Sequence, residues 1–236
     1  MQTQDDFLGG RVRLWQEKEG LRATSDSVLV AAAVRAERGD SVLDVGTGNG
    51  VVALCLNARV SDLKLTGLDV QPDLVALAEK NAKANGCDFQ GVIADLNKRP
   101  SPLHGKQFHH VVTNPPFYDE PNRRSNDQVA KAYHQGTDLA IWLNFCLRHV
   151  RAKGTLTLIH RPEELAEILQ ILDGKLGGIE IIPVQSKAGE PAKRVLIRGR
   201  MNSKKKLTML PALVMHTLGG KRTRMAERIL RHGVGI

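Results

Sequence analysis

The residues that most clearly suggest chemistry are four in succession, Asn114-Pro115-Pro116-Phe117, at the end of an apolar run. Two adjacent prolines remove two backbone donors and stiffen the turn, so the Asn114 amide is held in a fixed direction. An amino group on a heteroaromatic ring is a poor nucleophile because its lone pair is delocalised. If the Asn114 side-chain oxygen and the Pro115 carbonyl accept both of its N–H bonds, the nitrogen becomes pyramidal and its lone pair becomes available. Phe117 offers a face on which a base can stack, worth about 1–3 kcal/mol.

A glycine-rich segment from Asp44 to Gly50 forms a second group, reading Asp-Val-Gly-Thr-Gly-Asn-Gly. Glycines at a strand-to-helix turn let a ligand approach the backbone without a Cβ in the way. Val51 stands where a dinucleotide fingerprint would need its last glycine, which disfavours a nicotinamide dehydrogenase. Asp69 closes the next strand, where a carboxylate can bind both ribose hydroxyls of an adenosine. Asp95 follows the third strand, either as another ligand at the same edge or as a solvated loop-edge acid.

Strand-like and helical segments alternate through most of the chain and must position these groups. The expected strands are residues 41–45, 64–69, 89–94, 109–113 and 154–160, followed by 179–185 and 194–198. The last two are joined by a linker too short for a helical crossover, so they should pair antiparallel. We therefore expect an α/β, Rossmann-like fold: a mostly parallel sheet of seven strands with an antiparallel C-terminal hairpin and helices on both faces. Ligands should bind at the carboxyl ends of the strands.

Two regions lie outside this alternation, which predicts three parts. Residues 1–40 suggest a lid made of a hairpin and a helix over 27–38, with Asp26 or Ser25 as its N-cap. Residues 41–200 form the cofactor-binding domain. Residues 201–236 form a basic C-terminal extension with a short apolar segment (207–216) and a basic helix (222–231).

The charge is unevenly distributed along the chain. The net charge is +9, yet 13 Lys and Arg against two acidic residues follow position 185, while the rest holds 21 against 23. Such a block attracts phosphate backbones, unless it is only a solvated tail.

The cysteines and the apolar runs set further limits. Three widely spaced cysteines without a C-x-x-C pair argue against disulfides or zinc and fit a reducing cytoplasm. Cys55 and Cys146 are expected to be buried thiols. The longest apolar run, residues 28–34, is too short to cross a bilayer, and no secretory signal is evident. No membrane association and no bound metal are expected.

Together these motifs resemble the class I S-adenosylmethionine-dependent methyltransferases, and the terminal hairpin is also a feature of that fold. The resemblance implies S-adenosylmethionine as cofactor, with Asp44 near its amino group, Asp69 on its ribose and Asp95 on the amino group of its adenine. The implied cofactor-binding residues are Asp44, Gly46, Thr47, Gly48, Gly50, Asp69, Val70, Asp95 and Asn114. The tetrad Asn114, Pro115, Pro116 and Phe117 then resembles that of enzymes that methylate adenine N6, guanine N2 in ribosomal RNA, or a protein glutamine.

More of the chain, roughly residues 10–215, resembles the bacterial valine-tRNA adenine-N6 methyltransferase family. The resemblance lies in the segments 16–20 and 24–30, in His160-Arg-Pro162, and in the hairpin residues 187–191 and 193–196. It implies tRNA as the partner. Phe117 and Tyr118 offer faces on which a base can stack. Arg123 and Arg124 follow the tetrad and could contact phosphates near the target nucleotide, although they could equally be ordinary polar loop residues. The chain departs from the family at Lys131-Ala-Tyr133-His134, and residues 221–236 have no counterpart.

Four alternatives remain. Guanine-N2 methylation of ribosomal RNA uses the same tetrad. Protein-glutamine methylation does too, but such enzymes usually carry a separate N-terminal helical domain. A non-catalytic RNA-binding module would be free to lose Asn114, Pro115 and Asp69, all of which are present. In isolation, the tetrad could also be a proline-stiffened loop that ends a strand.

Overall fold

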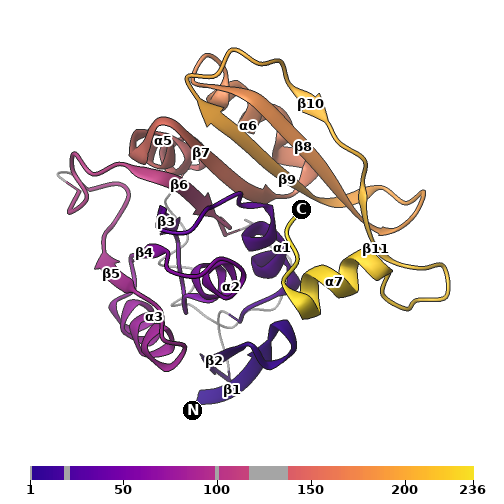
Figure 1. The fold of residues 1–236 in the computed structure, drawn as a ribbon. Helices are drawn as coiled ribbons and strands as arrows, with labels where there is room; N and C mark the ends of the chain where they lie inside the picture. Colours follow the sequence, from indigo (N-terminus) through magenta and orange to yellow (C-terminus); the bar gives the residue numbers. More distant parts are fainter. Residues whose placement is uncertain (1, 19–21, 99–100, 117–137) are drawn as a thin grey trace.

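The computed structural model describes residues 2–18, 22–98, 101–116 and 138–236, and they form one central sheet with helices on both faces (Figure 1). The sheet order is β10-β8-β9-β7-β6-β3-β4-β5, and β11 also pairs with β8. Its strands are β3 (Ser41–Val45), β4 (Lys64–Asp69), β5 (Phe89–Ile93), β6 (Phe108–Thr113), β7 (Val150–His160), β8 (Leu176–Lys187), β9 (Ala192–Met201), β10 (Thr208–Met209) and β11 (Leu213–His216).

The expected Rossmann-like architecture is confirmed. β3, β4, β5, β6 and β7 are mutually parallel, and β9 is antiparallel to both β7 and β8. The sheet has nine strands rather than seven, because β10 and β11 add in parallel to the outer edge of β8. β10 has only two residues, too few for any alternating pattern in the sequence.

Helices cover the two faces around separate apolar clusters. One cluster includes α1 (Ser25–Ala33), α2 (Val51–Arg59) and α7 (Arg224–His232), and α3 (Pro72–Ala84) joins it through Ala82. The other includes α5 (Leu139–His149) and α6 (Leu165–Leu172), the latter preceded by a 3-10 turn, η2 (Pro162–Glu164). Cys55 and Cys146 are buried free thiols, as expected. Among the described residues, no helix is long and apolar enough to span a membrane.

Residues 1–40 contain the expected hairpin, formed by β1 (Gln2–Phe7) and β2 (Val12–Glu17) around the turn η1 (Leu8–Gly10). The predicted N-cap of the following helix is wrong. α1 begins at Ser25, and the Thr24 side chain accepts a hydrogen bond from the Asp26 backbone N–H at 3.3 Å. The Asp26 carboxylate instead pairs with Arg194 of β9 at 2.7 Å.

The basic C-terminal segment packs onto the body of the protein. Ala226 and Ile229 of α7 are fully buried in the first cluster. The last residue is held in place as well: the Ile236 N–H donates to Ala32 and its carbonyl accepts from Arg198. The α7 helix lies beside α1 (Figure 1).

Candidate active site

The glycine loop links the first two parallel strands at their carboxyl ends. Gly46, Gly48 and Gly50 all have positive φ (75°, 53° and 86°), which favours glycine at each position. The Asp69 side chain accepts a hydrogen bond from the Gly48 N–H at 3.0 Å, while its other oxygen accepts from the Gln71 N–H. Asp69 thus ties the loop to the end of β4.

Asp44 is the most strongly perturbed acid at this edge. One carboxylate oxygen accepts from the Thr47 hydroxyl at 2.8 Å, and the other is buried without a hydrogen-bond partner among the described residues. Burial, with a smaller contribution from nearby Asp69, raises the pKa of Asp44 to about 7. A buried carboxylate with an unused oxygen is well suited to a cationic ligand group.

The other predicted cofactor residues lie on the same edge. Val70 follows β4 and is half-buried. Asp95 follows β5 and accepts from both the backbone and the side-chain nitrogen of Asn97, so part of its role is to shape that turn. Between them, Ile93 is an apolar side chain with 53% exposure whose backbone is paired with Asp69. Ile93 could not be identified from the sequence, because its exposure depends on strand position rather than on residue type.

The described part of the tetrad stands at the end of β6, the strand next to β3. The Asn114 side-chain oxygen is buried and has no hydrogen-bond donor among the described residues. Pro115 and Pro116 line an adjacent cavity of about 260 Å³. Phe117, Tyr118, Arg123 and Arg124 lie outside the described residues, so their predicted roles stay predictions.

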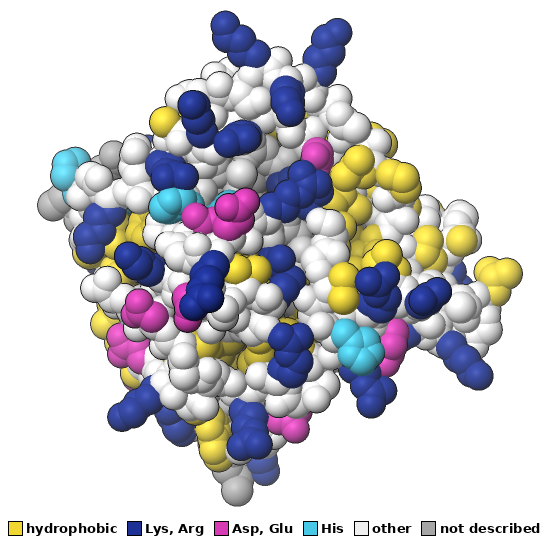
Figure 2. Space-filling view, viewed as in Figure 1, with side chains coloured by type: hydrophobic (Ala, Val, Ile, Leu, Met, Phe, Trp, Pro, Cys, Tyr) yellow, Lys and Arg dark blue, Asp and Glu magenta, His cyan; other side chains and the backbone are white. Residues whose placement is uncertain are grey.

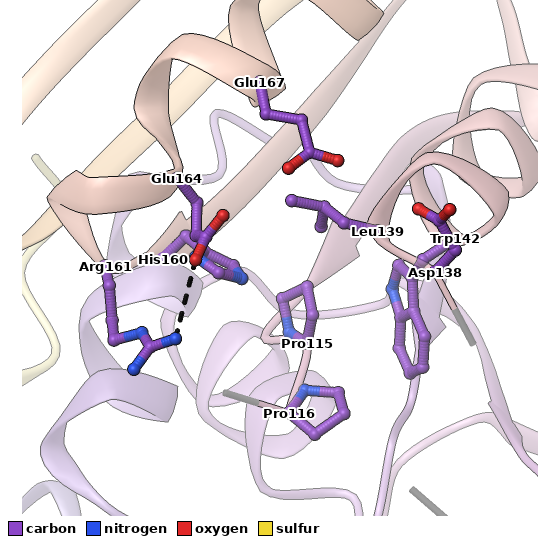
Figure 3. A pocket seen from close by; sticks show the side chains of 9 residues that line it. All are labelled: Pro115, Pro116, Asp138, Leu139, Trp142, His160, Arg161, Glu164 and Glu167. Atoms are coloured by element: carbon purple, nitrogen blue, oxygen red, sulfur yellow. Dashed lines mark ion pairs between the residues drawn. The ribbon is translucent and has the colours of Figure 1, made fainter. Parts of the chain in front are cut away.

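The cavity walls come from α5, the end of β7 and the start of α6. Figure 3 shows Pro115 and Pro116 between Trp142 on one side and His160 and Arg161 on the other. Arg161 pairs with Glu164 at 3.6 Å. Burial lowers the pKa of His160 to about 4, so the imidazole is neutral at physiological pH. A neutral imidazole can donate a hydrogen bond from one ring nitrogen and accept one at the other.

Trp142 connects the cofactor loop to the tetrad strand. Its indole N–H donates to the Thr113 hydroxyl at 2.8 Å, and that hydroxyl donates to the Val45 carbonyl at 2.7 Å. A Cβ on Gly46 would lie 2.7 Å from the indole ring, so this glycine is required by packing as well as by φ. No local sequence pattern indicates that Trp142 reaches two functional segments.

The N-terminal hairpin supports the loop from the opposite side. Asn81 of α3 is fully buried, and its amide donates to the carbonyls of Trp15 and Asn49, at 2.9 Å each. The Gln16 side chain accepts from the Ala23 backbone at 3.0 Å and from the Asn49 amide at 3.5 Å. The predicted lid therefore contacts the glycine loop directly.

Comparison with known proteins is consistent with this geometry. Residues 23–141 match the family described as "Methyltransferase small domain". The chain belongs to this family. It is an S-adenosylmethionine-dependent methyltransferase, as the sequence motifs predicted.

The chain is similar in sequence to two curated relatives and in fold to a solved structure. The chain is 26% identical over 204 residues to the "tRNA1(Val) (adenine(37)-N6)-methyltransferase" of Actinobacillus succinogenes, covering 84% of each. It is 32% identical over 137 residues to the "Release factor glutamine methyltransferase" of Deinococcus radiodurans, covering 56% of this chain and 47% of that one. A crystal structure of a predicted O-methyltransferase from Agrobacterium tumefaciens superposes with a TM-score of 0.74 at 23% identity, covering 89% and 98%, which establishes the shared fold.

The residues present fit the cofactor that this family uses. The partnerless oxygen of Asp44 is suited to the cofactor's ammonium group, and the exposed face of Ile93 is suited to an adenine ring. Among the described residues, no cluster of His, Cys, Asp or Glu side chains could hold a metal ion.

Proposed function

We propose that this protein methylates N6 of an adenine in tRNA. The observation that carries the proposal is the Asn114 side-chain oxygen, which is buried without a donor among the described residues, at the strand end next to the glycine loop. Such an oxygen is ready to accept an N–H from an amino group. The names of the relatives that match most of this chain support tRNA adenine as the target.

The tetrad would do its work by holding the target amine in place. The Asn114 oxygen and the Pro115 carbonyl accept the two N–H bonds, which directs the nitrogen lone pair toward the carboxyl edge of β3. Bound S-adenosylmethionine supplies an electrophilic methyl group there. Trp142 fixes the distance between the two sites through its bond to Thr113. In-line positioning of this kind can replace covalent catalysis.

The cofactor-binding roles follow the same edge of the sheet. Asp44 holds the amino group of the cofactor, and Asp69 holds the ribose hydroxyls. Asp95 would accept a hydrogen bond from the amino group of its adenine, Ile93 would offer an apolar face to the ring, and the backbone of the glycine loop with Thr47 and Val70 would complete the site.

The substrate side includes neutral His160, which lines the cavity and can hydrogen-bond a base edge. We assign base stacking to Phe117 and Tyr118, and phosphate contacts to Arg123 and Arg124. An unpaired loop adenine enters such a pocket at little cost, because no base pair must be broken. A tRNA substrate would place the enzyme in the cytoplasm.

Methylation of a protein glutamine is the second candidate, because the Deinococcus relative shares 32% identity. A glutamine amide is also planar and carries an NH₂ group, so the same tetrad could hold it. However, that match covers less than half of the relative, whereas the tRNA enzyme matches over 84% of its length.

The two candidates separate in a labelled-methyl transfer assay with total tRNA, ribosomal RNA and a glutamine-containing release factor as substrates. We expect label in tRNA, recovered as N6-methyladenosine after digestion to nucleosides. Label recovered as N2-methylguanosine, or in the protein substrate, would contradict the proposal.

A further inference from the structure

A second concave surface lies at the amino edge of the sheet, at the opposite end of the strands from the tetrad. This groove has a volume of about 450 Å³ and includes His109 and His110 at the start of β6. Thr155 of β7 also lines the groove, whereas His160 of the same strand lines the catalytic cavity. Thr157, the groove residue of β7 nearest to His160, lies three residues before it, which corresponds to about 10 Å of strand. The groove is therefore separate from the active site.

Of the three acidic groups that the described residues place in the groove, Glu180 is neutralised by arginines, whereas burial lowers the pKa of His110, so its contact with Asp40 does not cancel the Asp40 charge. Glu180 pairs with buried Arg198 at 2.5 Å and with Arg35 at 3.2 Å. Asp40 contacts His110 at 3.0 Å and His109 at 3.5 Å. Glu37 is the remaining carboxylate among the described residues that line the groove.

Four exposed cations of the groove, in contrast, are not paired with acidic side chains of the described residues. Arg151, Lys153, Arg200 and Lys205 have no ion-pair partner among the described residues. They come from three segments, namely the start of β7, the end of β9 and the loop after it. The Ser203 hydroxyl lies beside them and can donate a hydrogen bond, whereas the Thr155 hydroxyl bonds His110 at 2.7 Å and Thr157 is buried. Clustered cations with a hydroxyl donor beside them are suited to phosphate binding.

The backbone that carries these cations is held rigidly. The Arg200 Nε donates to the Lys153 carbonyl at 2.9 Å, which leaves the outer guanidinium nitrogens for a ligand. The Lys205 carbonyl accepts from the Gly178 N–H at 2.7 Å. At the neighbouring Gly154, a Cβ would lie 2.8 Å from the His109 carbonyl, so the turn at the start of β7 is tightly packed. Preorganised cations lose less conformational entropy on binding.

The positive surface continues beyond the groove. Arg198 links the groove to the end of the chain, because it also donates to the Ile236 carbonyl at 2.9 Å. The exposed Arg224 and Arg228 lie on the adjoining helix α7. Figure 2 shows Lys and Arg side chains around the upper hollow, where histidine and acidic side chains also lie, and again at the lower right. A surface this extended suits a polyanion better than a single phosphate ion.

We propose that the amino-edge groove binds the phosphate backbone of the RNA substrate, at a site remote from the methylated base. This inference rests on the proposed tRNA function. It implies that the RNA reaches both edges of the sheet. Part of the affinity then comes from phosphate contacts that do not depend on the RNA sequence.

The test uses two double variants that each remove two positive charges, Arg151→Gln with Lys153→Gln, and Arg200→Gln with Lys205→Gln. The matched control is Arg13→Gln with Lys83→Gln, which removes the same charges from exposed positions on β2 and α3. Binding of unmodified tRNA to the full-length protein is measured by fluorescence anisotropy at several salt concentrations. Methyl transfer is measured as kcat and as KM for tRNA.

Each groove variant should bind tRNA about 10-fold more weakly at low salt, and the slope of log K against log salt should fall by about 2. KM for tRNA should rise while kcat and cofactor affinity stay unchanged, and the control should behave as wild type. Groove variants that match the control in affinity and slope would overturn the inference, even if calorimetry showed that inorganic phosphate binds in the groove. If wild type neither binds nor methylates tRNA, the proposed function itself fails, and the two failures are thereby distinguished.

Discussion

The side chain of Asn114 combines two properties that seldom coexist, burial and the lack of a hydrogen-bond donor for its oxygen among the described residues. Leaving a buried acceptor unsatisfied costs about 1–3 kcal/mol, which folded proteins usually avoid outside functional sites. The substrate amine would supply the missing donor, so the cost is recovered on binding. The oxygen is thus preorganised for a ligand.

Replacement of Asn114 by Ala removes that acceptor. We expect Asn114→Ala to lower kcat by about 10²–10³-fold, the usual effect of deleting one preorganised polar group at a reacting centre. Cofactor affinity, measured by calorimetry, should stay within a factor of about two if the acceptor serves only the amine. Asn144→Ala, on the outer side of α5, is the matched control. Retained activity in Asn114→Ala would refute the assigned role.

The buried carboxyl of Asp44 leads to a prediction about pH and stability. Because burial raises its pKa to about 7 from an ordinary value of 3.8, the folded protein holds a proton that the unfolded chain releases. This favours the folded state at low pH, and the advantage is lost as pH rises toward and through 7. The Asp44→Asn variant should not lose stability in this way as pH rises, since the Asn side chain does not titrate.

The cofactor-free Asp44→Asn variant should therefore exceed wild type in Tm at pH 8 by about 3 °C or more, and the gap should narrow at pH 5.5. Differential scanning calorimetry across this pH range measures the difference. The same variant should bind S-adenosylmethionine more weakly, because the charge facing the ammonium group is gone. A Tm difference that does not change with pH would contradict the shifted pKa.

At the scale of elements, α5 determines how the loop after β3 and the end of β6 lie relative to each other. Trp142 projects from this helix against Gly46 and hydrogen-bonds Thr113, whose hydroxyl in turn holds Val45. A buried network of this kind is stabilising only when it is complete. Shifts of the helix would therefore change the separation of cofactor and tetrad.

Trp142→Phe keeps an aromatic ring against Gly46 but removes the donor to Thr113. We expect the free energy of unfolding to fall by about 1 kcal/mol and kcat to fall, with cofactor affinity little changed. Thr113→Val should cost more, because it also removes the hydrogen bond to the Val45 carbonyl, and the double variant should cost less than the sum, because both changes break the Trp142–Thr113 bond. Urea unfolding and single-turnover kinetics on all three variants check this. Strict additivity would exclude a shared network.

Much of this element arrangement could be predicted from local sequence. Alternation predicted the parallel strands, and the spacing of Asp44, Asp69 and Asp95 predicted that these acids share one edge of the sheet, as they do. These features follow from chain periodicity, which is local. The contacts of these acids with the cofactor stay predictions. Trp142, Ile93 and Asn81 could not be found in this way, since each acquires its role from a partner far along the chain. The N-cap was misassigned because Ser, Thr and Asp at positions 24–27 are all good caps.

Over the whole molecule, acidic and basic side chains are separated between the two edges of the sheet. The carboxyl edge of the sheet holds Asp44, Asp69 and Asp95, which suits a sulfonium cofactor with an ammonium group. The end of the basic C-terminal segment lies at the other edge, because Ile236 bonds to Ala32 near the end of α1. If the proposed function holds, cations placed there attract RNA without competing with the acids assigned to the cofactor.

This separation makes the α7 arginines testable independently of catalysis. Arg224→Gln with Arg228→Gln removes two exposed charges, and neither has an ion-pair partner among the described residues. The helix should stay folded because Ala226 and Ile229, which anchor it, are untouched. Truncation would be a poorer test, since it would remove those buried residues together with the charges.

We expect the α7 variant to reduce the salt slope of tRNA binding by about 2, with kcat at saturating tRNA unchanged. Circular dichroism and Tm confirm that the helix is intact, and anisotropy titrations from low to physiological salt give the slope. An unchanged slope would mean that these arginines only solvate the helix. A lower kcat with normal affinity would contradict the assignment of these arginines to RNA binding alone.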